Sequence, residues 1–128
     1  MDGFHARCVR CIIGVKHSYW SRISNRDVLS RVHAIPLSNL LLEQQLNYFG
    51  KVFRLPNEDI RRQLIFENNS YILRRVNTRS RGRPRAQWNH EVLNHALLAA
   101  GGLDILKTVI QDKDNWKQMV RKYCRFND

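Results

Sequence analysis

The sequence predicts an all-α protein: about six short-to-medium helices with one Arg-rich irregular loop at residues 68–84. Apolar residues recur every three or four positions through most of the 128-residue chain, which is the spacing of helices that pack on a core. Breaker pairs such as Ile35-Pro36 and Gly101-Gly102 divide this pattern into segments. No region is rich in strand-forming residues, and these observations together favour the all-α class.

The N-terminal part is expected to hold two short helices. The first has one apolar stripe, and Gly14 weakens its end; the stripe consists of Phe4, Cys8, Cys11, Ile12 and Val15. A linker at residues 17–23 follows. Ser24, with Asp27 three residues later, resembles a capping box. It predicts a second short helix whose inner side is formed by Val28, Leu29 and Val32.

A longer helix is expected from a cap at Ser38 to about Arg54, after the Ile35-Pro36 interruption. It carries two neighbouring apolar stripes and is therefore predicted to be central to the core. The stripes are Leu42, Leu46, Phe49 and Phe53, and Leu41, Tyr48, Val52 and Leu55. Asn57 can cap a further helix to about Glu67, with an inner side of Ile60, Leu64 and Ile65.

The C-terminal part is expected to be helical again from Arg85. Pro84 suits a first helical turn, and Gly101-Gly102 suits a left-handed helix end. A short helix follows, built on Leu103, Leu106, Val109 and Ile110, and the last one starts at an Asp112 cap. Its apolar stripe is Trp116, Met119, Val120, Tyr123 and Cys124. The parts 1–67, 68–84 and 85–128 are expected to form one domain, 1–128.

The charge balance favours a polyanionic partner. The chain has 22 Lys and Arg against 11 Asp and Glu, a net charge of +11, which points to nucleic acid before a membrane. No apolar run approaches the ~20 residues that span a bilayer, and no secretory signal is recognisable. With three cysteines, the expected location is nuclear or cytoplasmic, neither secreted nor transmembrane.

More than half of this charge lies between Arg74 and Arg85, where six arginines occur in twelve residues without an acid. The planar guanidinium group suits phosphate, and six such contacts would give a salt slope of roughly −4 to −5. The candidate nucleic-acid-binding residues are therefore Arg74, Arg75, Arg79, Arg81, Arg83 and Arg85, with Lys51 and Arg54 as auxiliaries. The alternative is a solvated loop that improves solubility. Without a base-reading helix, these contacts indicate positioning more than sequence readout.

The sequence contains two other features that are typical of nucleic-acid contact: an AT-hook-like segment and aromatic residues that can stack on bases. Arg81-Gly82-Arg83-Pro84 resembles the core of an AT-hook, which lies in the minor groove of A·T-rich DNA, but the helix expected directly after it argues against a free hook. Trp88 and Trp116 lie on apolar stripes and are expected in the core. Tyr19 and Trp20, in the expected linker, remain candidates for stacking on bases.

Catalytic and metal sites find little support in the sequence. Cys8 and Cys11 have the spacing of a zinc-binding pair, but no second close pair accompanies them, and buried thiols are the simpler reading. His90-Glu91 with His95 departs from the metalloprotease spacing. No nucleophile elbow or phosphate-binding loop occurs. We expect no enzymatic activity, no cofactor, no metal and no small-molecule substrate.

Several segments resemble one family: the region downstream of the polymerase core, the thumb and following helices, in non-LTR (LINE-type) retrotransposon endonuclease/reverse transcriptase proteins. The segment from Phe4 to Val15 is similar to the family's aromatic, Arg-Cys-Leu-Arg and Ile-Leu-Gly-Ile pattern. Arg22–Leu29 is similar to Arg-x-Ser-Asn-x-Glu-Val-Leu, and Leu46–Pro56 to Leu-x-Trp-Leu-Gly-His-Val-x-Arg-Met. Arg81–Trp88 resembles Gly-Arg-Pro-x-x-x-Trp, and Asp112–Val120 resembles Asp-Arg-x-x-Trp-x-x-x-Val.

The resemblance implies a helical region that holds template RNA, primer or target DNA, with RNA slightly favoured over DNA. It does not imply polymerase activity, because the family's aromatic-x-Asp-Asp turn does not occur in this sequence. Lys51 stands where the family usually has His. Two alternatives stay open: a helical protein-interaction or structural module whose Arg-rich loop meets an acidic protein surface or an anionic membrane, and a nonfunctional retrotransposon remnant.

Overall fold

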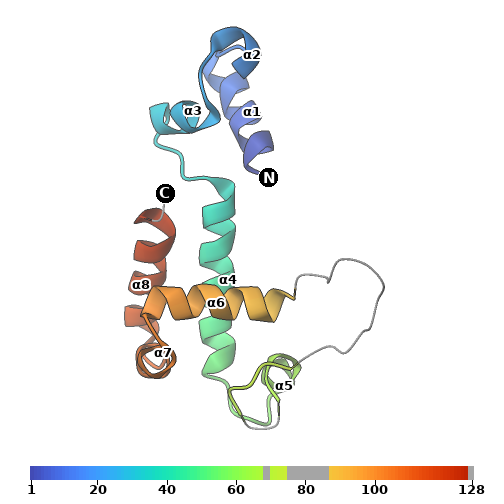
Figure 1. Ribbon diagram of the computed structural model, residues 1–128, viewed down its shortest axis with the longest axis vertical. Helices are drawn as coiled ribbons and strands as arrows, with labels where there is room; N and C mark the ends of the chain where they lie inside the picture. Colours follow the sequence, from blue (N-terminus) through green and yellow to red (C-terminus); the bar gives the residue numbers. More distant parts are fainter. Residues whose placement is uncertain (68–69, 75–86, 127–128) are drawn as a thin grey trace, which may run out of the picture.

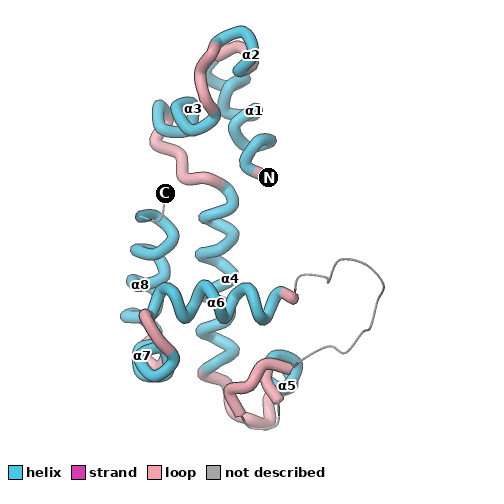
Figure 2. The backbone as a smooth tube through the Cα atoms, in the orientation of Figure 1, coloured by secondary structure: helices cyan, strands magenta, loops and turns pink. Residues whose placement is uncertain are grey.

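The computed structural model describes residues 1–67, 70–74 and 87–126. The described part contains eight helices and, as its one extended pairing, an isolated antiparallel bridge between Phe66 and Leu73 (Figures 1 and 2). The all-α prediction is confirmed, and each expected helix has a counterpart; α2 is the additional one. The helices are α1 Asp2–Ile13, α2 Ser18–Ser21, α3 Asn25–Arg31, α4 Leu37–Phe53, α5 Ile60–Ile65, α6 Trp88–Ala100, α7 Leu103–Val109 and α8 Lys113–Phe126.

The buried apolar residues form two separate clusters. The smaller one joins α1 to α3 through Val9, Val28 and Leu29. The larger one joins α4 to α6, α7 and α8, with further residues from α5 and the Phe66–Leu73 bridge. Figure 1 shows α1, α2 and α3 at one end of the molecule, connected to the rest at the start of α4. There the Asp2 carboxylate accepts hydrogen bonds from the Ser38 backbone N–H (2.8 Å) and hydroxyl (2.6 Å).

Helices α4 and α8 lie side by side and antiparallel (Figure 1). Trp116 of α8 is buried, and its indole N–H donates to the Leu46 carbonyl of α4 (3.1 Å). A side chain at Gly50 would overlap the Trp116 ring, so the absence of a Cβ there permits the close approach. The first predicted stripe of α4 and the stripe of α8 are largely confirmed, since Leu46, Phe49, Phe53, Trp116, Val120 and Cys124 are all buried. The second stripe predicted for α4 is wrong in part: Val52 is buried, but Leu41 and Tyr48 are 43% and 47% exposed.

Helix α6 crosses α4 (Figure 1), and it contributes Val92, Ala96 and Ala100 to the larger cluster. Trp88, which was expected in the core, is exposed. It ends at Gly101, whose left-handed backbone (φ 83°) confirms the predicted helix end. Helix α7 follows as expected. Asp112 caps α8 by accepting the Asp114 and Asn115 backbone N–H groups, also as expected. The described part of α6 begins at Trp88, and the predicted start at Pro84 and Arg85 lies outside the described residues.

The apolar stripe predicted for the first helix is wrong. Phe4 and Ile12 are 67% and 82% exposed, whereas Ala6, Val9 and Arg10 face inward. Arg10 is buried because its guanidinium donates to the Lys16 and Ile23 carbonyls, the Ser21 hydroxyl and the Asn25 amide oxygen. Hydrogen bonds of this kind offset the free-energy cost of burying a charge. A hydropathy pattern does not predict such bonds, and it therefore assigns arginine to the exposed face.

Helix α2 occupies the middle of the predicted linker, at Ser18–Ser21. The Ser24 cap of α3 is confirmed, since its hydroxyl oxygen accepts the Asp27 N–H (3.1 Å). Val28 and Leu29 are buried as predicted, but Val32 is exposed at the end of α3. Ser38 does not cap α4. Pro36 occupies that position, and Ser38 lies in the first turn, where it donates to Asp2.

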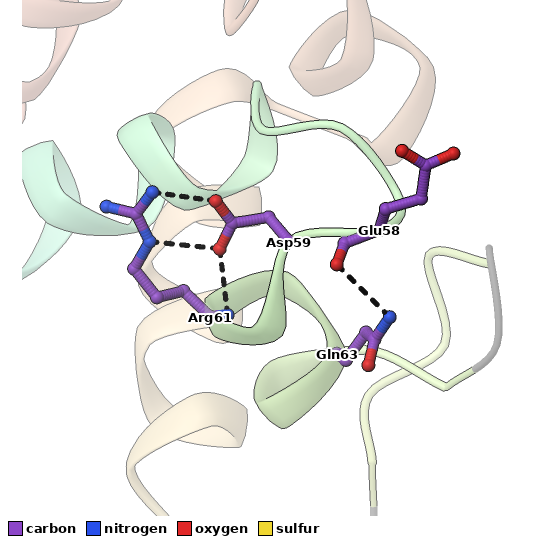
Figure 3. A network of polar contacts seen from close by, with 4 residues as sticks. All are labelled: Glu58, Asp59, Arg61 and Gln63. Atoms are coloured by element: carbon purple, nitrogen blue, oxygen red, sulfur yellow. Dashed lines mark hydrogen bonds and ion pairs between the residues drawn. The ribbon is translucent and has the colours of Figure 1, made fainter.

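The inward face predicted for the helix after Asn57 is also wrong in part. Asp59, not Asn57, caps α5. The Asp59 carboxylate also forms an ion pair with Arg61 (2.7 Å), and the Gln63 side chain donates to the Glu58 carbonyl (Figure 3). The Arg61 hydrogen bonds lower the pKa of Asp59 to about 2. Ile65 is buried as expected, but Ile60 and Leu64 are exposed, and Arg62 is buried in their place.

Candidate nucleic-acid interface

A groove of about 700 Å³ runs between α4, the start of α8 and the chain that follows α4. Five of its ten lining residues are cationic, and only one is a carboxylate. The ten are Glu43, Gln44, Asn47, Lys51, Arg54, Leu55, Lys113, Trp116, Lys117 and Arg121. The surplus of positive charge makes this groove the strongest candidate, in the described part of the chain, for binding an anion.

Lys51 and Arg54, both predicted from the sequence, lie in this groove. Lys51 is exposed in the last turn of α4. Arg54 directly follows α4, is half-buried, and donates from Nη1 to the Ile110 carbonyl (2.6 Å). That bond uses one of the five N–H donors of the guanidinium and fixes its position, so Arg54 can present its other donors to the groove.

The opposite wall comes from α8 and was not predicted. Lys113, Lys117 and Arg121 are spaced four residues apart, which places them along one face of the helix. This spacing is visible in the sequence, but a row of cations beside an apolar stripe is also typical of a solvated helix surface. Only the antiparallel packing of α8 on α4 brings the row opposite Lys51 and Arg54.

The cations of the groove are largely unpaired. Arg121 lies 3.4 Å from Glu43, at the upper end of hydrogen-bond range, and its side chain is half exposed. Within the described residues, no ion pair joins a carboxylate to Lys51, Lys113 or Lys117. Exposed ammonium groups without a protein partner can bind phosphate without first breaking an ion pair.

The predicted arginine cluster is described only at its first member. Arg74 is exposed; its N–H donates to the Ile65 carbonyl (2.8 Å), and its own carbonyl accepts from the Asn89 side chain (3.0 Å). These bonds hold the start of the Arg-rich segment between α5 and α6. Outside the described residues lie Arg75, Arg79, Arg81, Arg83 and Arg85, together with the AT-hook-like residues.

A buried guanidinium anchors the same region. Arg62 donates to the Phe53 carbonyl (2.6 Å) and to the Asn57 amide oxygen (3.0 Å). Its Cζ lies 5.7, 5.1 and 5.2 Å from the ring centroids of Phe53, Phe66 and Tyr71. These contacts tie α5 to the end of α4 and to the bridge that precedes Arg74. The sequence shows no distinct signal for this role.

The other candidates for chemistry are dispersed. Cys8 is half-buried and Cys11 is exposed on α1, whereas Cys124 is buried on α8, and burial raises the pKa of its thiol to about 11. His95 is bonded to the Tyr123 hydroxyl (2.9 Å). Among the described residues, no three His, Cys, Asp or Glu side chains gather into a possible metal site.

Comparison of the chain with protein-family models, with curated proteins and with solved structures gave no match. Over the described ranges, no single helix is long and apolar enough to cross a membrane. Helices α6 and α7 reach the required length and apolar character only as a pair, and that pair is bent by 86°.

Proposed function

We propose that this chain is a non-catalytic, helical nucleic-acid-binding module that holds RNA or DNA through its backbone phosphates. The observation that carries the proposal is the α4–α8 groove, where Lys51, Lys113 and Lys117 form no ion pair with a carboxylate of the described ranges. Phosphate contact needs cations presented along a path, and the groove supplies them from two helices. Arg74 adds the start of a second basic segment.

The resemblance to the post-polymerase region of non-LTR reverse transcriptases supports the same proposal and favours RNA slightly over DNA. In that interpretation, the module positions a template, primer or target strand and performs no chemistry itself. Contacts through phosphate do not read base sequence, so binding is expected to vary little between sequences.

The test is fluorescence anisotropy with labelled structured RNA, single-stranded DNA and duplex DNA across a salt series. Lys113→Ala/Lys117→Ala removes two groove cations, and Lys122→Ala/Arg125→Ala removes two exposed cations of α8 outside the groove. The first pair is expected to weaken binding and to reduce the salt slope by about 2, since each lost phosphate contact reduces it by about 1. The control pair is expected to have a much smaller effect.

Equal losses from both pairs would mean that binding follows net charge and not the groove. A third variant changes the six arginines from Arg74 to Arg85 to Ala and measures the contribution of that segment. If the folded chain bound none of the three polymers, the proposal would be wrong. A helical protein-interaction module would then be favoured, because Leu98 and Ile105 of α6 and α7 are 69% and 51% exposed.

A further inference from the structure

An exposed aromatic pair lies on α2, at the end of the molecule formed by α1, α2 and α3 (Figure 1). Tyr19 and Trp20 are 69% and 74% exposed, and their rings meet edge to face with centroids 5.1 Å apart. Large aromatic side chains usually bury most of their surface. Neither ring contributes to either hydrophobic cluster of the described residues, so the fold of those residues does not account for their presence.

The backbone beneath this pair is held in place. The buried Arg10 guanidinium donates to the Lys16 carbonyl before α2, and to the Ser21 hydroxyl and the Ile23 carbonyl at its end. Within the turn, the Trp20 and Ser21 N–H groups both donate to the His17 carbonyl (2.9 and 3.0 Å). A short turn fixed at both ends presents its side chains at low entropic cost on binding.

The chain segment that carries the pair is basic. From Gly3 to Arg26 the chain has five Lys and Arg and no Asp or Glu. A cavity of about 160 Å³ lies next to α2 and contains no carboxylate; it is lined by Gly3, Arg7, Arg10, His17, Ser18 and Asn25. His17 and Ser18 line this cavity and directly precede the two aromatic residues, so the cavity lies beside the turn that carries the pair.

We infer that Tyr19 and Trp20 form a stacking platform for the unpaired bases of a single-stranded polynucleotide, with a backbone phosphate bound beside Arg7 and His17. An exposed aromatic ring close to a guanidinium matches the two parts of a nucleotide, and base stacking is insensitive to sequence. A duplex offers the phosphates but keeps its bases stacked inside. The inference rests on the proposed function, because both take a nucleic acid as the partner. The residues of the platform, however, are different from those of the α4–α8 groove.

The experiment compares three labelled ligands: an oligothymidine strand, an abasic strand of equal length, and a duplex with the same number of phosphates. Tyr19→Ala/Trp20→Ala is expected to weaken binding of the oligothymidine by at least about fivefold, and to leave the abasic strand and the duplex unchanged. Leu98→Ala/Ile105→Ala, which also removes two exposed apolar side chains, is the control and is expected to change none.

A second readout is tryptophan fluorescence. The oligothymidine is expected to quench the emission of the wild type, the abasic strand is not, and Trp20→Leu is expected to lose the quenching while it keeps apolar bulk. Because both rings are exposed, these variants leave the buried clusters intact, which far-ultraviolet circular dichroism verifies.

The inference is overturned if the Tyr19/Trp20 variant binds all three ligands like the wild type, or loses all three equally. The same measurements separate this inference from the proposed role of the groove. If Lys113→Ala/Lys117→Ala binds every ligand like the wild type while the aromatic variant loses binding of the oligothymidine alone, the stacking platform is supported and the groove proposal is wrong. A folded wild-type chain that binds none of the ligands overturns both proposals.

Discussion

Two of the arginines, Arg10 and Arg62, are buried without a carboxylate partner among the described residues. Carbonyl and amide oxygens surround both guanidinium groups, and aromatic rings also surround that of Arg62. The planar guanidinium can donate in several fixed directions at once, which a lysine ammonium cannot reproduce. Two of the cations that make up the net charge therefore hold the fold together and are not available to a phosphate.

Arg62→Lys is expected to destabilise the protein by about 2 kcal/mol, because hydrogen bonds from a buried charge are lost and the ammonium remains desolvated. The melting temperature measured by circular dichroism is expected to fall by roughly 5 °C or more. Arg61→Lys is the matched control: Arg61 is exposed, and its replacement is expected to leave the melting temperature almost unchanged. Equal effects from the two neighbours would contradict the anchoring role of Arg62.

The Asp2–Ser38 contact is expected to depend on pH. Hydrogen bonds from the Ser38 hydroxyl and then from its backbone N–H lower the pKa of Asp2 below its ordinary value of 3.8. Since the folded pKa is the lower one, the stabilisation is present above pH 3.8 and is lost as the pH falls through the folded pKa. Asp2→Ala is expected to lower the melting temperature at pH 6, with a gap to the wild type that narrows below about pH 3.8. A gap that stayed constant with pH would mean that the charge of Asp2 does not matter.

At the scale of helices, the first apolar stripe of α4 and the stripe of α8 predicted the core well, whereas the second stripe of α4 predicted it only at Val52 and Leu55. Each stripe recurs over several turns, so single exceptions do not hide it. Glycine and aspartate at the helix ends were also informative, as Gly101 and Asp112 show. A left-handed glycine and an aspartate that accepts backbone N–H groups both act within a few residues of the helix end. Such ends can therefore be predicted from the sequence alone.

Short helices were predicted less well. In α1 and α5 the buried face includes an arginine, and apolar side chains such as Ile12 and Ile60 are exposed. In a helix of two or three turns, only a few apolar positions indicate which face is buried. A single buried arginine is therefore enough to make that prediction wrong. The partners that allow Arg10 to be buried lie 6 to 15 residues away in the chain, beyond any helical spacing.

Only part of the candidate interface could be predicted. Lys51 and Arg54 were predicted from their place at the end of the central helix, and they lie in the groove. Lys113, Lys117 and Arg121 were missed because their role depends on the packing of α8 against a helix about 70 residues earlier in the chain, as the Trp116–Leu46 hydrogen bond shows. Contacts between distant segments are absent from a local pattern.

Gly50→Ala tests the α4–α8 packing. Alanine favours a helix over glycine by about 1 kcal/mol, but the added methyl overlaps the buried Trp116 ring. Overpacking costs about 1–3 kcal/mol, and we expect net destabilisation by chemical denaturation. Gly3→Ala is the control, since an added Cβ there has open space, and it is expected to be neutral or stabilising. Stabilisation of the protein by Gly50→Ala would show that the two helices have room to separate.

At the scale of the whole molecule, the two hydrophobic clusters differ greatly in size. Three buried residues hold α1 to α3, whereas fifteen form the cluster of α4 to α8. Local stability follows the buried apolar surface that an element shares with its neighbours. The two ends of the molecule are therefore expected to open with different free energies.

Native-state hydrogen exchange is expected to show weaker protection in α1 and α3 than in α4 and α8. Leu29→Ala, in the smaller cluster, is expected to speed exchange in α1 and α3 and to leave α8 unchanged. Leu46→Ala, in the larger cluster, is expected to lower protection in α4 and α8. Uniform acceleration by Leu29→Ala would instead indicate a single cooperative unit.

The separation of the two clusters also bears on how such a sequence can evolve. Among the residues that the structure describes, no side chain belongs to both clusters, so a substitution in one cluster is expected to need no compensating change in the other. Related sequences would then show correlated substitutions within each cluster and few between them, with Asp2 and Ser38 as the expected exception. The part formed by α1, α2 and α3 could then diverge in sequence, or be replaced at its connection to α4, while the α4–α8 groove kept its geometry.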